Sequence, residues 1–306
     1  MPFITIKGTF RLIGRTKGGA ASGFEPDGDS MQFRPDRPKL LDQLERLTAT
    51  YRLTTVGSTQ LRFEGIDALE LHFTAKKAGV THQPRPLADD ARDHLVTGAG
   101  LDPVTYRPPN RIRVQPPAPH DGARGYILSR SLEVHGRPVA FVFAGNPPGK
   151  DGDRVRLTTA WLRKSLNYEM LRAGQAYPLF YDTLFADLRS ELDKAARQAR
   201  QAKRGIWNVD RTLAGLHASS IAQLETRAFV FPKLFRRLAE FFATGAQQVS
   251  RFPAWLAATK ERVLDLDTTN NTHFDTFVRV VNGSIKLTKS PDRLVFVSAK
   301  GKDAWV

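Results

Sequence analysis

The sequence contains no cysteine. Structural disulfides and metal sites built from thiolates are therefore excluded, although this absence fits any cellular compartment. Long apolar runs are missing as well. No stretch approaches the ~18 continuous apolar residues that a membrane span needs, and no apolar run of signal-peptide length stands at the N-terminus. We therefore expect a cytoplasmic protein without a transmembrane segment.

Positive charge is in clear excess. The chain has 306 residues, with 46 Lys and Arg against 31 Asp and Glu, which gives a formal net charge of +15. A protein this basic usually meets something anionic, such as nucleic acid, a phospholipid surface or an acidic partner. Apolar residues make up 41% of the chain, enough to build a core. The length suits one large domain or two of ordinary size.

Hydrophobic patterning predicts a mixed α and β protein. Alternation and β-branched residues predict strands at 3–13, 31–33, 60–66, 126–132 and 138–144, and helical spacing predicts helices at 39–48, 87–96, 159–172 and 183–203. After Arg211 the pattern of apolar residues changes. There we expect amphipathic helices at 229–242 and 252–264, and strands at 274–281, 283–287 and 294–298. We therefore place a domain boundary near residue 212, between domains 1–211 and 212–306.

Three carboxylates stand at predicted loop or strand ends: Asp29, Asp67 and Glu70. Hard divalent cations prefer such oxygen ligands, so together these residues are candidates for a metal site. By themselves they fit magnesium or manganese as well as calcium. The alternative for Asp29 is an ordinary turn, because Asp27-Gly28-Asp29-Ser30 is a common turn pattern.

Two arginines are candidates for binding a phosphate, Arg62 and Arg137. Phosphodiester cleavage builds negative charge on the phosphate oxygens, and the forked guanidinium matches that geometry. The alternative is that each is a solvated surface charge. Arg62 and Asp67 start on opposite faces of the predicted strand, so the chain must turn near Gly65 to bring them together.

In combination, these residues resemble a known family. The run Arg62-Phe63-Glu64-Gly65-Ile66-Asp67-Ala68-Leu69-Glu70 resembles the Arg-x-x-x-Gly-Ile-Asp-Ala-Pro-Glu signature of the staphylococcal nuclease-like (thermonuclease) family. Four further segments are similar to that family and follow its order: the Asp-Gly-Asp turn at 27–30, a Gly-Arg hairpin at 135–140, a helix at 165–176 and a closing helix with Gly-Ile-Trp at 195–207. The resemblance covers residues 3–208.

The resemblance implies an α+β fold, with a five-stranded OB-fold β-barrel and packed helices over 1–211 and a C-terminal α/β extension over 212–306. It implies a Ca²⁺-dependent nuclease that hydrolyses DNA, RNA or both by general-base activation of water. Asp29 and Asp67 match the family's metal carboxylates, and Ala68 matches a residue whose backbone carbonyl binds the metal. Glu70 matches the proposed base, and Arg62 and Arg137 match the two arginines that clamp the phosphate.

Some positions depart from the family pattern. Leu69 replaces the usual proline before Glu70, and His135 replaces a tyrosine that often lines the nucleotide pocket. Tyr177 and Tyr181 lie near the place of other stacking tyrosines, so His135, Tyr177 and Tyr181 are candidates for binding nucleic acid. The longer segment between Glu70 and Tyr126 is interpreted either as an extension of the nucleic-acid groove or as a surface loop.

Two alternatives remain open at this point. The first is a nucleic-acid-binding module of the same fold without catalytic activity. The second concerns residues 212–306, which would direct the nuclease to a partner. There the helix 229–242, which carries Lys233, Arg236 and Arg237, would dock on a protein or an anionic membrane. Alternatively, this helix packs as an ordinary core helix against the strands at 274–298.

Overall fold

The computed structural model describes residues 2–45, 50–76 and 78–298. Contacts divide them into two compact units. The first unit holds the residues up to 64 together with 92–170, and the second holds 65–91 together with the residues from 171 onward. The second unit therefore includes residues on both sides of position 212, where the sequence predicts a boundary.

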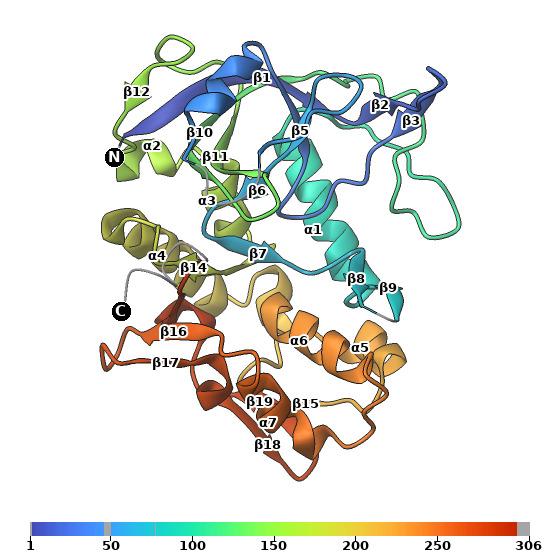
Figure 1. Ribbon diagram of the computed structural model, residues 1–306, viewed down its shortest axis with the longest axis vertical. Helices are drawn as coiled ribbons and strands as arrows, with labels where there is room; N and C mark the ends of the chain where they lie inside the picture. Colours follow the sequence, from blue (N-terminus) through green and yellow to red (C-terminus); the bar gives the residue numbers. More distant parts are fainter. Residues whose placement is uncertain (1, 46–49, 77, 299–306) are drawn as a thin grey trace. The chain divides into compact units, whose positions relative to one another are not determined.

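The first unit is built on one barrel-like sheet (Figure 1). Its strands follow the order β5-β4-β1-β10-β11-β6, with β12 beside β1. The two end strands of this order are β5 and β6, and only Leu61 separates them in the sequence. The two edges of the sheet therefore lie close together, and the sheet is nearly closed. The strands are β1 (Phe3–Arg11), β4 (Gln32–Pro35), β5 (Thr59–Gln60), β6 (Arg62–Phe63), β10 (Arg124–Leu132), β11 (Pro138–Ala144) and β12 (Arg154–Val155).

Aromatic and branched residues fill the interior of this sheet, as the alternating patterns predict. Phe10 on β1 and Phe33 on β4 are fully buried, and their ring centroids lie 5.8 Å apart. Gly125 on β10 leaves room for the ring of Phe10, because a Cβ at residue 125 would lie 2.3 Å from it. The predicted strands 3–13, 126–132 and 138–144 are confirmed as β1, β10 and β11 within a few residues.

Short helices and one hairpin complete the first unit. The predicted helix 159–172 is wrong as a single helix, because it breaks at Ser165, whose hydroxyl donates to the carbonyl of Leu162 and accepts from the amide of Tyr168. The predicted helix 39–48 is a 3-10 helix where it is described, and residues 46–49 lie outside the described residues. The elements are β2 (Ile13–Arg15), β3 (Ala21–Gly23), η1 (Pro38–Gln43), α2 (Thr159–Leu162), α3 (Leu166–Arg172) and α1 (Arg85–Gly98), which begins in the second unit.

The second unit combines small sheets with helices. One sheet pairs β7 with β13, another is the β8–β9 hairpin, a third has the order β14-β20-β16-β17, and a fourth has the order β15-β19-β18. The strands are β7 (Ile66–Ala68), β8 (Phe73–Ala75), β9 (Gly79–Thr81), β13 (Ala176–Pro178), β14 (Phe180–Tyr181), β15 (Leu216–His217), β16 (Arg262–Asp265), β17 (Asn271–His273), β18 (Val278–Val281), β19 (Ser284–Leu287) and β20 (Leu294–Phe296). The helices are α4 (Ala186–Gln201), η2 (Gly205–Asn208), α5 (Ile221–Arg227), α6 (Pro232–Phe242), η3 (Val249–Arg251), α7 (Phe252–Ala257), η4 (Phe274–Phe277) and η5 (Pro291–Arg293).

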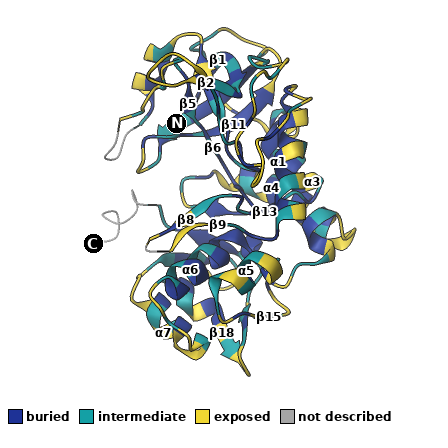
Figure 2. Ribbon diagram, turned by 90° about the vertical axis from the view of Figure 1, so that its right-hand side faces the viewer, coloured by how far each residue is buried: buried dark blue, intermediate teal, exposed yellow. Residues whose placement is uncertain are grey.

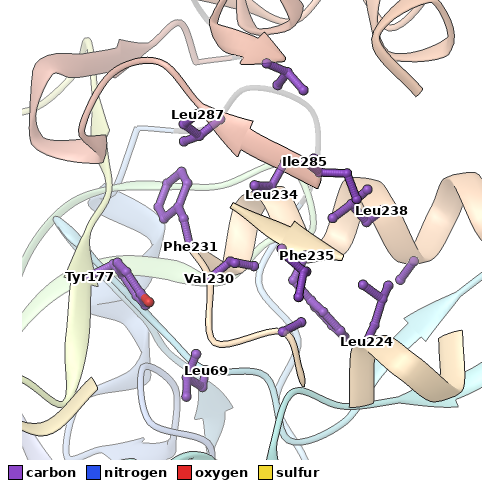
Figure 3. Close-up of a cluster of buried hydrophobic side chains, with 14 of the residues drawn as sticks. Leu69, Tyr177, Leu224, Val230, Phe231, Leu234, Phe235, Leu238, Ile285 and Leu287 are labelled. Atoms are coloured by element: carbon purple, nitrogen blue, oxygen red, sulfur yellow. The ribbon is translucent and has the colours of Figure 1, made fainter. Parts of the chain in front are cut away.

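Helix α6 lies at the centre of the second unit's apolar core and is largely buried (Figure 2). In Figure 3, Leu234, Phe235 and Leu238 of α6 gather with Ile285 and Leu287 of β19. The expectation that this segment is a core helix packed on the C-terminal strands is therefore confirmed. Leu69 and Tyr177, from the region assigned to the nuclease domain, belong to the same core. No helix among the described residues is long and apolar enough to cross a membrane.

Candidate active site

Asp29 and Arg62 are positioned by neighbouring segments of the first unit. The Asp27–Ser30 turn is closed by two bonds: the amide of Asp27 donates to the carbonyl of Ser30, and the Asp27 carboxylate accepts from the amide of Gly28 at 2.8 Å. The backbone carbonyl of Asp29 accepts from the amide of Phe63 at 3.1 Å. Phe63 follows Arg62 on β6, so the turn brings Asp29 beside the strand that carries Arg62.

Arg137 lies in the tight hairpin between β10 and β11. Gly136 there has a φ of +82°, and a Cβ at this position would lie 2.2 Å from the carbonyl oxygen of Thr50. The turn therefore requires glycine. The carboxylate of Glu133 accepts from the amides of His135 and Arg137 and from Nε of Arg137 at 3.2 Å. Glu133 thus fixes both the hairpin and the direction of the Arg137 side chain, whereas His135 is exposed.

Strand β6 connects these elements. It runs parallel to β11, with Arg62 opposite Val139, two residues after Arg137. The buried side chain of Asn167 joins the same strands: its Nδ2 donates to the carbonyls of Glu64 and Ala140, and its Oδ1 accepts from the amide of Val142. The first unit therefore gathers the backbones of Asp29, Arg62 and Arg137 around β6, and Asn167 holds that strand in register.

The remaining predicted residues belong to the second unit. The chain turns at Gly65, with a φ of +78°, as the sequence predicts. Asp67 and Ala68 then follow on β7, and both are buried. Leu69, in place of the family's proline, inserts fully into the apolar core, which anchors the peptide before Glu70. The amide of Glu70 donates to Oε1 of Gln83, and its carbonyl accepts from the amide of Gln83.

The acid pair has a partner that the sequence does not predict, Arg236 on α6. Its Nη1 donates to Oδ1 of Asp67 at 3.0 Å, and its Nη2 donates to Oδ2 at 3.1 Å. The same Nη1 donates to a carboxylate oxygen of Glu70. The sequence places Arg236 on a helix that either docks on an external partner or packs in the core, and neither alternative predicts a pairing with Asp67 and Glu70.

Electrostatics keep Arg236 charged. Burial acts to lower the pKa of its guanidinium, but the negative charges of Asp67 and Glu70 outweigh burial and raise the pKa well above its ordinary value. The side chain of Arg236 is 20% exposed, that of Asp67 2% and that of Glu70 15%. The acid pair therefore shares one permanent cation of the same unit, which offsets part of its negative charge.

The two tyrosines proposed to stack on bases have other surroundings. Tyr177 is fully buried, and its hydroxyl donates to the carboxylate of Asp210 at 2.8 Å. Burial and the nearby Asp210 raise the pKa of Tyr177 well above its ordinary value. Tyr181 is half-buried, and its hydroxyl accepts from Nζ of Lys233 at 3.4 Å. In this arrangement, Tyr177 is a core residue whose ring cannot meet a base.

A basic cavity in the first unit was not foreseen either. It has a volume of about 490 Å³ and is lined by Arg11, Arg15, Arg34, Thr55, Val56 and Gly57. Arg11 is held by Asp121 at 2.7 Å, and the hydroxyl of Thr55 donates to the backbone carbonyl of Arg15. These residues come from β1, β2, β4 and the segment before β5, so strand pairing brings them together. The sequence signal was the presence of arginines near three strand ends.

Residues 131–209 match the family model described as staphylococcal nuclease homologue. The resemblance inferred from the motifs is thereby confirmed over residues 131–209. A search of curated proteins found no significant match to the chain.

The family segment contains Arg137 with its hairpin and the buried Asn167, as well as the helices α2 to α4. Asp29, Arg62, Asp67, Ala68 and Glu70 precede the matched residues, so their roles stay predictions. Staphylococcal nuclease relatives are typically calcium-dependent.

The acid pair does not fit a calcium ion in the arrangement that the structure shows. Calcium takes six to eight oxygen ligands, whereas both carboxylate oxygens of Asp67 already accept from Arg236. Within residues 2–45, 50–76 and 78–298, no group of three or more His, Cys, Asp or Glu side chains is placed to hold a metal. A cation would have to displace the guanidinium before it could bind Asp67 and Glu70.

Proposed function

We propose that this protein is a nuclease that hydrolyses phosphodiester bonds in DNA, RNA or both. The observation that carries the proposal is Arg137: it lies in a glycine-dependent hairpin, within the segment that matches the staphylococcal nuclease family. The net charge of +15 suits a polyanionic substrate. The family assignment itself supports a nuclease-like fold, and the activity is our inference from it.

We also propose that the barrel-like sheet of the first unit is a five-stranded OB-fold. Counting residues 59–63 as one strand, the sheet has five main strands, and the first pairs with both the second and the fourth. The parallel pair of β6 with β11 brings the third beside the fifth. Such barrels commonly bind single-stranded nucleic acids, which agrees with the proposed substrate.

In the proposed reaction, Arg62 and Arg137 bind the phosphate and stabilise the charge that develops on its oxygens. Glu70 orients a water molecule and accepts its proton, so the resulting hydroxide forms a bond to phosphorus while the P–O bond on the opposite side breaks and the leaving oxygen takes a proton from solvent water. The guanidinium of Arg236 donates to one oxygen of the Glu70 carboxylate, so this carboxylate becomes a stronger proton acceptor when that contact is broken. We assign no step to a metal, since the acid pair does not fit one in this arrangement.

A digestion panel tests this function. Circular and linear DNA and RNA would be incubated with the purified full chain in calcium, magnesium, manganese or EDTA. We expect cleavage that is lost in Glu70→Gln and retained in Arg113→Ala, an arginine of the first unit that pairs with Glu25 at 2.7 Å. A Glu70→Gln protein that cuts as fast as the parent would remove Glu70 from the mechanism.

A second candidate function is nucleic-acid binding without cleavage. It is favoured by the pairing of both acids with Arg236, which leaves the arginine-rich first unit as the part suited to phosphate. Fluorescence anisotropy with labelled single-stranded DNA and RNA separates the two functions. Salt-sensitive binding with no cleavage under any of the metal conditions would support the binding module and contradict the nuclease.

A further inference from the structure

The contact between Arg236 and the acid pair has the form of an occupied cation site. The guanidinium spans both oxygens of Asp67 at 3.0 and 3.1 Å and also binds Glu70. A bidentate arginine-carboxylate pair is among the strongest charged hydrogen-bond arrangements in proteins. All three side chains are largely withdrawn from water, so the positive charge lies where the family's divalent cation is expected.

Helix α6 is tied to the peptide that carries the acids. Gln83 is fully buried and bonds in two directions: its Oε1 accepts from the amide of Glu70, and its Nε2 donates to the carbonyls of Ala228 and Val230, just before α6. The ring of Phe235 on α6 lies 6.4 Å from that of Phe73 on β8, centroid to centroid. Buried bonds and ring packing therefore set the position of Arg236, which is not a loose surface side chain.

The basic neighbours of Arg236 on α6 have a different acid. Nζ of Lys233 lies 2.6 Å from Glu261, and Nε of Arg237 lies 3.0 Å from the same carboxylate. Arg237 also binds Glu240 within α6. Arg236 therefore pairs with Asp67 and Glu70, whereas Lys233 and Arg237 pair with Glu261. Arg237 is thus a matched control for Arg236.

We propose that Arg236 is a built-in cation that occupies Asp67 and Glu70 in place of a divalent metal and closes the acid pair to metal ions. A tethered guanidinium competes with free calcium at a high effective concentration. Calcium that displaced it would also leave a largely buried guanidinium without its carboxylates, which is unfavourable. The cleavage consequence, a turnover that is slowed while Arg236 occupies the acid pair and rises when it withdraws, rests on the proposed function, whereas the cation-binding statement does not.

The test measures metal binding by the full chain. Calcium would be titrated by calorimetry into the parent protein, Arg236→Gln, Arg236→Lys and the control Arg237→Gln, with circular dichroism to confirm that each is folded. We expect Arg236→Gln to bind calcium at least tenfold more tightly than the parent, and Arg237→Gln to match the parent. Adding Asp67→Asn to Arg236→Gln should abolish the gain.

Arg236→Lys keeps the test decisive if the glutamine variant does not fold. An ammonium is a point charge that lacks the two-pronged contact to both oxygens of Asp67, so this variant should still bind calcium several-fold more tightly than the parent. Equal calcium affinities for the parent and for every folded Arg236 variant would overturn the proposal, as would a parent protein that binds calcium tightly through Asp67.

Cleavage assays on the same variants separate this proposal from the proposed function. An Arg236→Gln protein that gains calcium binding without cutting DNA or RNA supports the built-in cation and contradicts the nuclease. A parent protein that cuts in calcium, with Arg236→Gln unchanged in both binding and cutting, supports the nuclease and overturns the built-in cation.

Discussion

The candidate site residues of the two units differ in how far their charged side chains are exposed. In the first unit, Arg137 is held by Glu133 at a hairpin, and its side chain keeps 29% of its surface exposed. In the second unit, Asp67 keeps 2% exposed and is covered by Arg236 from a packed helix. The difference matters because a phosphate can reach an arginine at a hairpin directly, whereas a cation reaches the acid pair only by displacing a guanidinium. Arg137 is therefore more accessible to a ligand than the carboxylate of Asp67.

The largest expected effect concerns the packing of α6, the helix that carries Arg236. Phe235→Ala removes a fully buried ring of α6, and we expect the free energy of unfolding to fall by ~3–5 kcal/mol, through lost burial and a cavity. Urea denaturation measures this change. Leu213→Ala, at a residue 42% exposed in the same unit, serves as the control and should change stability little. Equal effects of the two substitutions would mean that α6 is not firmly packed.

The next effect concerns Arg137. Arg137→Ala should reduce the turnover of a DNA or RNA substrate by ~10²–10³-fold, because a preorganised donor to the developing charge is lost. The backbone hairpin should persist, since Glu133 still accepts from the amides of His135 and residue 137. Steady-state kinetics measures the effect, and the melting temperature checks the fold. Unchanged turnover in a folded variant would remove Arg137 from the site.

A smaller effect depends on pH in the second unit. Burial acts to raise the pKa of Glu261, but Lys233 and Arg237 outweigh it and lower the pKa from 4.5 to about 2. A lowered folded-state pKa stabilises the fold above pH 4.5, and this contribution is lost as the pH falls toward 2. The shift corresponds to ~3 kcal/mol as an upper value.

Urea unfolding at a series of pH values measures this contribution. The difference in free energy of unfolding between the parent and Glu261→Gln should shrink as the pH falls from 4.5 to about 2. A difference that stays constant with pH would show that Lys233 and Arg237 do not stabilise the Glu261 carboxylate. The ion pairs that distinguish these two residues from Arg236 would then contribute nothing to stability.

The smallest effect concerns the arginine-lined cavity of the first unit. Arg34→Ala removes one of its three guanidinium groups, and we expect a few-fold weaker binding of a single-stranded oligonucleotide at moderate salt. The slope of log affinity against log salt should fall by ~0.7, the value for one lost contact with a single strand. Anisotropy titrations at several salt concentrations measure both quantities. A slope change no larger than that of Arg113→Ala would exclude this cavity from the binding surface.

Local features of the fold could be predicted from the sequence. Alternation of apolar residues predicted β1, β10 and β11, and apolar spacing predicted α6, because each pattern reflects which face of an element is buried. The break at Ser165 was not predicted. The Ser165 hydroxyl bonds to nearby backbone groups, which interrupts the helix, but the spacing of the apolar residues stays the same as in a continuous helix. The burial of Tyr177 was missed because its partners, Asp210 and Phe231, come from distant segments.

The sequence by itself determined the local geometry of the candidate site. Glycine at 136 and the Asp27–Ser30 turn depend on a few consecutive residues, whose backbone angles and short-range hydrogen bonds suffice to form them. Only the tertiary structure decided what faces the acids. Arg236 lies 166 positions from Glu70 in the chain, and no local pattern links the two. Their pairing exists because the apolar side of α6 is buried in the second unit's core, which aims the neighbouring arginine at Asp67 and Glu70.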